Sequence, residues 1–115
     1  MCENWPNTSN KTCLFDGDTL WLQGENIRLK GIDTPELRTH LCGRYFEVNL
    51  ARLASARLLQ LLNGAAWTIE RFGFDSTTSK RRLATIRIDG RDVGEILIAE
   101  GLARRWPDGY EFWCR

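Results

Sequence analysis

The sequence lacks the features that mark several classes of protein. No apolar run approaches the roughly eighteen residues of a membrane span, and the first ten residues contain no hydrophobic core of a signal peptide. The chain has one His and no C-x-x-C pair, which argues against a structural zinc site. With 115 residues and 43% apolar content, we expect one compact domain without a membrane segment or an obligate protein partner.

The sequence also lacks a clear excess of one charge, since 16 Lys and Arg face 15 Asp and Glu. A formal charge of +1 argues against a general nucleic-acid binder. The balance is nevertheless an average of two opposed regions. Residues 14–36 carry five acidic and two basic side chains, whereas residues 71–91 carry six basic and two acidic ones. Thirteen of the basic residues are Arg, whose planar guanidinium binds phosphate or carboxylate through two hydrogen bonds.

Four cysteines, Cys2, Cys13, Cys42 and Cys114, lie far apart in the sequence. They indicate disulfides or buried thiols, and three pairings are open to them. An even number of cysteines in a small domain is typical of an oxidising compartment. We therefore expect a secreted or periplasmic protein.

The hydrophobic pattern predicts strands, then a helix, then strands again. Apolar residues at helical spacing between 48 and 62 predict an amphipathic helix whose buried stripe comprises Leu50, Leu53, Ala54, Leu58 and Leu61. The predicted strands cover residues 13–15, 19–22, 26–30, 67–72 and 82–88, and a second helix runs from a capping box at Asp92 to Gly101. This order indicates a mainly β protein with helices (α+β), built as a small closed barrel of the oligomer-binding (OB) type.

The first candidate site segment is Asp16-Gly17-Asp18-Thr19, at the head of a predicted strand. Glycine permits a tight turn, and carboxylates two residues apart can converge on a hard cation or on its waters. The same sequence also occurs as an Asx turn, in which the aspartate caps its own backbone. The segment alone leaves both interpretations open.

The second candidate segment is Asp33-Thr34-Pro35-Glu36, which follows Arg28 closely in the sequence. Pro35 favours an extended Thr34 and stiffens the turn that holds the two acids. Alternatively, the segment is a helix start with Thr34 as its N-cap. The two segments together place four acids within twenty-one residues, and a divalent cation would remove the repulsion between them.

These two segments, together with Arg81-Arg-Leu-Ala-Thr-Ile86 and Val93-Gly-Glu-Ile-Leu-Ile-Ala-Glu-Gly-Leu-Ala103, resemble the staphylococcal nuclease (thermonuclease) family over residues 13–105. The motifs stand in the family's order. The resemblance implies a five-stranded OB-fold barrel with two to three packed helices. It divides the chain into an N-terminal extension, 1–12, a nuclease-like domain, 13–105, and an aromatic tail, 106–115, packed on or near the barrel.

The resemblance also implies a metal site. Asp18, Asp33 and the backbone carbonyl of Thr34 would bind a Ca²⁺ ion, with Asp16 in the shell beyond them. Calcium tolerates irregular coordination by such oxygen ligands, and the two segments offer no His or Cys ligand.

The resemblance also implies that the protein is a nuclease acting on DNA or RNA. Its reaction would leave 5′-hydroxyl and 3′-phosphate ends. Glu36 would orient or deprotonate the attacking water. Arg28 and Arg81 would stabilise the negative charge that develops on the phosphate oxygens. The family's arginine stands two residues before a Leu-Ala pair, which selects Arg81 over Arg82.

Four further residues are candidate substrate contacts, namely Lys80, Arg82, Trp106 and Tyr110. The family commonly has Tyr-Gly before the second arginine, where this chain has Ser79-Lys80. Trp106 or Tyr110 would supply an aromatic surface for base stacking instead, unless both simply pack the tail. Two other functions stay open. They are a catalytically inactive nucleic-acid or protein binding module of the OB type, and a metal-dependent phosphodiesterase acting on small nucleotides.

Overall fold

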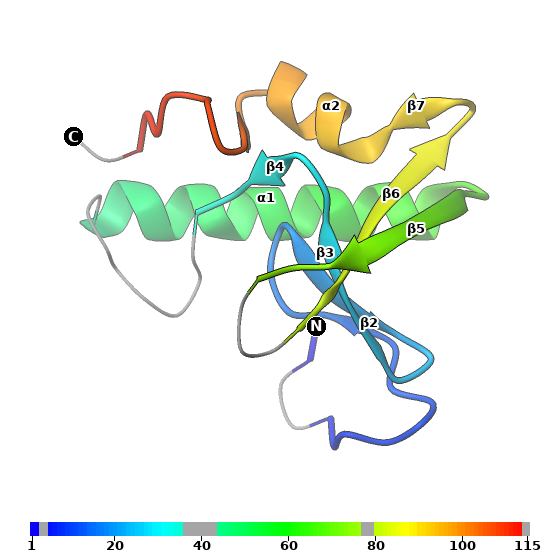
Figure 1. Ribbon diagram of the computed structural model, residues 1–115. Coiled ribbons are helices and arrows are strands. Elements are labelled where there is room, and N and C mark those ends of the chain that lie inside the picture. The colour runs from blue at the N-terminus through cyan, green and yellow to red at the C-terminus, as the bar shows by residue number, and fades with distance from the viewer. Residues whose placement is uncertain (3–4, 36–43, 77–79, 114–115) are drawn as a thin grey trace.

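The computed structural model describes residues 1–2, 5–35, 44–76 and 80–113 and has a mixed α+β architecture (Figure 1). Within these ranges, eight strands and two helices follow one another along the chain. They are β1 Cys13–Leu14, β2 Thr19–Leu22, β3 Glu25–Leu29, β4 Ile32–Asp33, α1 Arg44–Gly64, β5 Thr68–Phe74, β6 Arg82–Ile88, β7 Arg91–Asp92, α2 Val93–Ala99 and β8 Arg104–Arg105.

The main sheet has the strand order β1-β2-β3-β6-β5, and β7 adds to β6. Strands β3 and β6 are parallel, with Arg28 opposite Leu83, whereas the other pairs of this sheet are antiparallel. A separate antiparallel pair joins β4 to β8 and places Asp33 opposite Arg104. Among the described residues no pairing joins β1 to β5, so the sheet does not show the closed barrel that the sequence predicts.

The core lies between this sheet and the two helices. Ile27, Leu58, Ile86 and Leu97 are fully buried there, and they come from β3, α1, β6 and α2. Each helix or strand buries the face on which its apolar residues recur, about every 3.6 residues in a helix and every second residue in a strand. Burial of these side chains together stabilises the packing of the four elements. Among the described residues, neither helix has both the length and the apolar character that crossing a membrane requires.

Helix α1 differs from its prediction in two respects. It begins at Arg44, four residues before the expected start, in a segment where Tyr45 and Phe46 point to solvent and give no apolar stripe. Leu53 was expected in the buried stripe and is 59% exposed. Leu50, Ala54 and Leu58 are buried as predicted, and the small residues Ala51 and Ser55 are buried beside them, which lets the helix approach its neighbours closely.

The short strands β4, β7 and β8 were not predicted, because two residues are too few to show a period. Strands β2 and β6 have the predicted bounds. The N-cap of α2 is also confirmed, since the Asp92 carboxylate accepts a hydrogen bond of 2.7 Å from the backbone N–H of Gly94.

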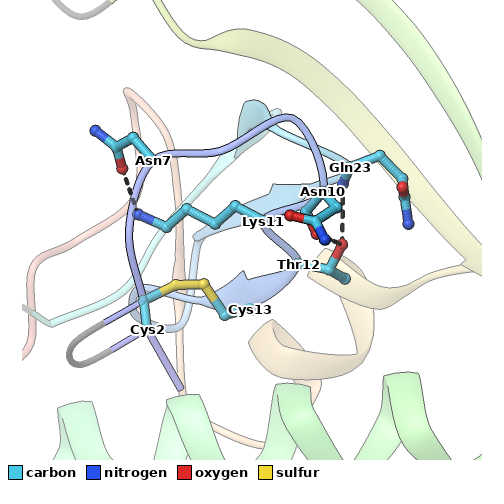
Figure 2. Close-up of a disulfide and its surroundings, with 7 residues drawn as sticks. All are labelled: Cys2, Asn7, Asn10, Lys11, Thr12, Cys13 and Gln23. Carbon is cyan, nitrogen blue, oxygen red and sulfur yellow. Dashed lines mark hydrogen bonds between the residues drawn. A yellow bond between two sulfur atoms is a disulfide. The ribbon is translucent and has the colours of Figure 1, made fainter.

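The N-terminal segment is attached to the sheet by a disulfide between Cys2 and Cys13 (Figure 2). The hydroxyl of Thr12 accepts a hydrogen bond of 3.0 Å from the N–H of Gln23, and the carbonyl of Lys11 accepts one of 2.9 Å from the next residue of the β2–β3 turn. The segment expected as an extension thus contacts the predicted hairpin. Cys42 and Cys114 lie outside the described residues, and the division of the chain at residues 12 and 105 stays a prediction.

Candidate active site

The two candidate segments meet at Asp18 and Thr34. The backbone N–H of Thr34 donates a hydrogen bond of 3.1 Å to Oδ2 of Asp18, and both residues are buried. A Cβ on Gly17 would lie 2.9 Å from Oγ1 of Thr34 and 3.0 Å from Cβ of Ala54. The turn before β2 therefore fits between β4 and α1 only because residue 17 has no side chain.

Asp16 contributes to the shape of this turn. Its Oδ1 accepts a hydrogen bond of 3.2 Å from the backbone N–H of Asp18, which is the Asx-turn geometry that the sequence allowed. The Asp18 carboxylate accepts a further hydrogen bond of 3.0 Å from the Thr19 hydroxyl. The Asx turn therefore forms, and it carries the Asp18 carboxylate that faces Thr34.

Arg28 lies between the two aspartates. Its Nη1 donates to the carbonyl of Ile32 at 2.8 Å and lies 3.2 Å from Oδ2 of Asp18. Its Nη2 lies 3.9 Å from Oδ1 of Asp33. A cation was expected to offset the repulsion between these acids, and in the structure a guanidinium already does so.

A second guanidinium, that of Arg104 on β8, contacts Asp33 from the other side. Its Nε and Nη2 lie 2.9 Å and 2.8 Å from Oδ2 of Asp33. Burial raises the pKa of the Asp33 carboxyl above its ordinary value, the hydrogen bond from Arg104 opposes that change, and the charge of Asp18 reinforces it. Asp33 therefore ionises less readily than a free aspartate.

Arg81 reaches the cluster through Thr19. Its Nη1 donates to the Thr19 hydroxyl at 3.1 Å, and that hydroxyl donates to Asp18. Its Nε and its backbone N–H both donate to the Asp75 carboxylate, at 2.7 Å and 3.0 Å, which fixes the side chain before β6 begins. Arg81 is thus held beside the carboxylate cluster with Nη2 uncommitted among the described residues.

A cavity of about 210 Å³ opens beside Asp33. In Figure 1 the C-terminal segment (red) and β4 (cyan) lie along the same flank of α1, and residues from all three line the cavity. Arg104 lies 5.0 Å from the centre of the Trp106 ring, which is 52% exposed. The lining residues are Asp33, Thr34, Glu47, Arg104, Trp106, Glu111 and Trp113.

The other predicted residues lie apart from this cluster or outside the described ranges. Arg82 donates to the carbonyl of Phe72 at 2.8 Å and pairs with Glu25, so its contacts differ from those of Arg81. Lys80 and Tyr110 are exposed and do not line the cavity. Glu36, the predicted general base, is outside the residues that the structure describes.

The residues around Asp18 offer the oxygen ligands that a hard cation prefers. Two carboxylates and the carbonyl of Thr34 are oxygen ligands, and both carboxylates already approach one positive group, that of Arg28. Over the described ranges, no three His, Cys, Asp or Glu side chains come together in a way that could hold a metal ion. The cluster thus fits calcium by its chemistry, while two arginines occupy its carboxylates.

A comparison with known protein families shows the family to which this chain belongs. The sequence model of the staphylococcal nuclease homologue family matches residues 26–111, about three quarters of the chain. The chain belongs to the staphylococcal nuclease homologue family. No curated protein sequence matches it significantly. The matched range of this staphylococcal nuclease homologue includes Arg28, Asp33 and Arg81 but begins after Asp18, whose place in the cluster rests on the contacts described above.

Sequence reasoning missed three charged residues of the site, namely Glu47, Arg104 and Glu111. Glu47 stands before the predicted start of α1, where the pattern gave no helix. Arg104 and Glu111 stand after the last predicted helix, where no strand was predicted. Arg104 is connected to the site only by the pairing of β4 with β8, which places it opposite Asp33, and Glu47 and Glu111 only by the cavity that they line with it.

Proposed function

We propose that this staphylococcal nuclease homologue is a calcium-dependent nuclease that hydrolyses phosphodiester bonds of DNA or RNA. Family membership supports a nuclease or nucleic-acid-binding function. The observation that carries the finer proposal is the convergence of Asp18, Asp33, Arg28 and Arg81 through direct contacts and the single hydroxyl of Thr19. Two carboxylates and two guanidiniums in one cluster match the needs of phosphodiester hydrolysis.

In this proposal Asp18, Asp33 and the Thr34 carbonyl hold the calcium ion. When bound, the ion supplies positive charge that polarises the phosphate and lowers the pKa of nearby water. The Thr34 N–H and the Thr19 hydroxyl keep the Asp18 carboxylate in one orientation, because each donates to a different oxygen. Asp16 fixes the turn and acts through the backbone of Asp18.

The two arginines bind the non-bridging oxygens of the phosphate. Nη1 of Arg28 donates hydrogen bonds to backbone carbonyls of the protein. Within the described residues, its Nε donates no hydrogen bond and its Nη2 approaches only Asp33. Arg81 commits Nε and Nη1, which leaves Nη2. Each arginine therefore keeps donors for the charge that develops in the transition state, on a side chain that is already ordered.

Glu36 is proposed to accept the proton of the attacking water or to orient that water. The proposal rests on its position three residues after Asp33, in the segment that resembles the family's own. Trp106 is proposed to stack on a base, because its ring is half exposed at the rim of the cavity that Asp33 lines.

The competing function is an inactive binding module of the same family. A gel assay on single-stranded DNA and RNA, with calcium and then with a chelator, separates the two. The nuclease proposal expects cleavage with calcium and none with the chelator. Equal binding without cleavage under both conditions would support the module. If neither nucleic acid is cleaved but mononucleotide esters, assayed in parallel, are hydrolysed with calcium, the result would support a small-molecule phosphodiesterase.

We further propose that the protein works in an oxidising compartment, as a secreted or periplasmic enzyme. The disulfide between Cys2 and Cys13 supports this location, because such bonds persist where thiols are not kept reduced. Mass spectrometry of the protein isolated from its natural source tests the proposal. An intact Cys2–Cys13 bond is expected, and a fully reduced protein in the cytosol would contradict it.

A further inference from the structure

The proposed function does not account for the ion pair between Arg104 and Asp33. Both Nε and Nη2 of Arg104 point at the same oxygen, Oδ2, at 2.9 Å and 2.8 Å. That oxygen belongs to a carboxylate which the proposed function assigns to calcium. A divalent cation and a guanidinium competing for one oxygen repel each other strongly, because the site is largely buried.

Arg104 has a second carboxylate within reach. Its Nη2 also lies 3.5 Å from Oε2 of Glu111, and its Nη1 donates to the carbonyl of Gly109 at 3.0 Å. The rings of Trp106 and Trp113 lie 5.0 Å and 5.8 Å from the guanidinium carbon. The guanidinium is therefore surrounded by groups that attract a positive charge, even without Asp33.

The neighbouring arginine provides a contrast within the same strand. Arg105 makes a two-armed ion pair with Glu95, at 2.6 Å and 2.7 Å, and its side chain is 61% exposed. The Arg104 side chain is 14% exposed and faces the cavity. A change at Arg105 thus removes the same charge from the same strand without touching Asp33.

We propose that Arg104 is a positioning residue that competes with calcium for Asp33 and moves onto Glu111 when the ion binds. This inference rests on the proposed function, since it assumes that calcium binds at Asp33. In the absence of the ion, the guanidinium keeps the buried carboxylate paired. When calcium takes over Oδ2, the guanidinium keeps the Gly109 carbonyl and strengthens its contact with Glu111.

Isothermal titration of calcium, without nucleic acid, tests the competition. Arg104→Gln should bind calcium about fivefold more tightly than the unmodified protein, because the competitor is gone. The calcium affinity of Arg104→Lys should fall between these two, since the lysine ammonium keeps the positive charge but lacks the planar pair of donors of the guanidinium. Arg105→Gln should leave the affinity nearly unchanged, and it controls for the loss of one positive charge.

Glu111 tests whether Arg104 has a second position. Glu111→Gln should weaken calcium binding about threefold in the unmodified background, because Arg104 then stays on Asp33. The same change should have no effect in the Arg104→Gln background. An equal loss in both backgrounds would show that Glu111 acts only through its charge and would overturn the switch.

The result for Arg104→Gln also separates this inference from the proposed function. If Asp33→Asn abolishes calcium binding while Arg104→Gln leaves it unchanged or weaker, calcium binds at Asp33 and the competition is wrong. If neither the unmodified protein nor Arg104→Gln binds calcium, the proposed function and the inference fall together. Thermal unfolding of each variant, followed without calcium, verifies that the variants fold.

Discussion

The backbone N–H of Thr34 donates a hydrogen bond of 3.1 Å to the carboxylate of Asp18, across sixteen residues of sequence. This contact joins the turn before β2 to the end of β4, and each of the two carries an acid, Asp18 or Asp33, that the proposed function assigns to calcium. The bond also uses a donor that the following Pro35 could not supply. The order of residues in the second segment is therefore part of what assembles the cluster.

Gly17→Ala should disturb this contact more than its size suggests. The new Cβ would meet Oγ1 of Thr34 at 2.9 Å, so the turn or β4 must shift. We expect a loss of about 2 kcal/mol in the free energy of unfolding and weaker calcium binding. Chemical denaturation and calcium titration measure the two effects.

Gly73→Ala is the matched control, because a Cβ there meets nothing within 4 Å and the residue has no left-handed backbone. It should keep both stability and calcium affinity. If Gly17→Ala behaves like Gly73→Ala, the close packing of the turn against β4 and α1 does not constrain the site.

Arg81→Ala and Arg82→Ala should differ sharply in activity, although the two residues are adjacent. Arg81 connects to Asp18 through Thr19, whereas Arg82 contacts Glu25 and the Phe72 carbonyl. We expect Arg81→Ala to lower the rate of hydrolysis about a hundredfold to a thousandfold with little change in fold. Arg82→Ala should retain most of the activity. A fully active Arg81→Ala protein would contradict the assignment of the second arginine.

Removing calcium should weaken substrate binding as well as abolish cleavage. The acidic region 14–36 and the basic region 71–91 cancel in the whole chain, and a bound calcium ion would raise the formal charge by two. Fluorescence anisotropy with single-stranded DNA measures this effect, using the Arg81→Ala protein so that cleavage does not interfere. Affinity should fall on chelation, and unchanged affinity would count against a calcium site in the acidic region.

Replacing both Cys2 and Cys13 with Ala should lower the free energy of unfolding by about 3 kcal/mol, since the disulfide closes a loop between residues eleven apart. Thr12→Val is the comparison, because it removes only the hydrogen bond to Gln23 and should cost less. Denaturant unfolding measures both. Equal stability of the double variant and the unmodified protein would mean that the N-terminal segment contributes little to the fold.

The sequence was informative where residues lie close together along the chain. The Asp16–Thr19 turn, the segment after Arg28 and the strand Arg82–Ile88 each contain their own signal, and the structure brings the first two into contact. The partner of Asp33 had no such signal. Arg104 is 71 residues away, in a two-residue strand without a period, and only the pairing of β4 with β8 connects them.

The exposure of Leu53 shows a second limit of the sequence. Its spacing fits the buried stripe of α1, yet the stripe is rotated toward Ala51 and Ser55. The helix packs closely against the turn before β2 at Ala54, where a Cβ on Gly17 would lie only 3.0 Å away. Periodicity predicts that a helix has a buried face but does not include the shape of its neighbour.

The central claim is that the cluster around Asp18 and Asp33 is a calcium-dependent nuclease site. Its most direct test is mass analysis of the ends produced from a short single-stranded oligonucleotide, for the unmodified protein and for Asp33→Asn, each with calcium and with chelator. Fragments with 5′-hydroxyl and 3′-phosphate ends are expected only from the unmodified protein with calcium. The same fragments from Asp33→Asn, or from the unmodified protein with chelator, would contradict the account.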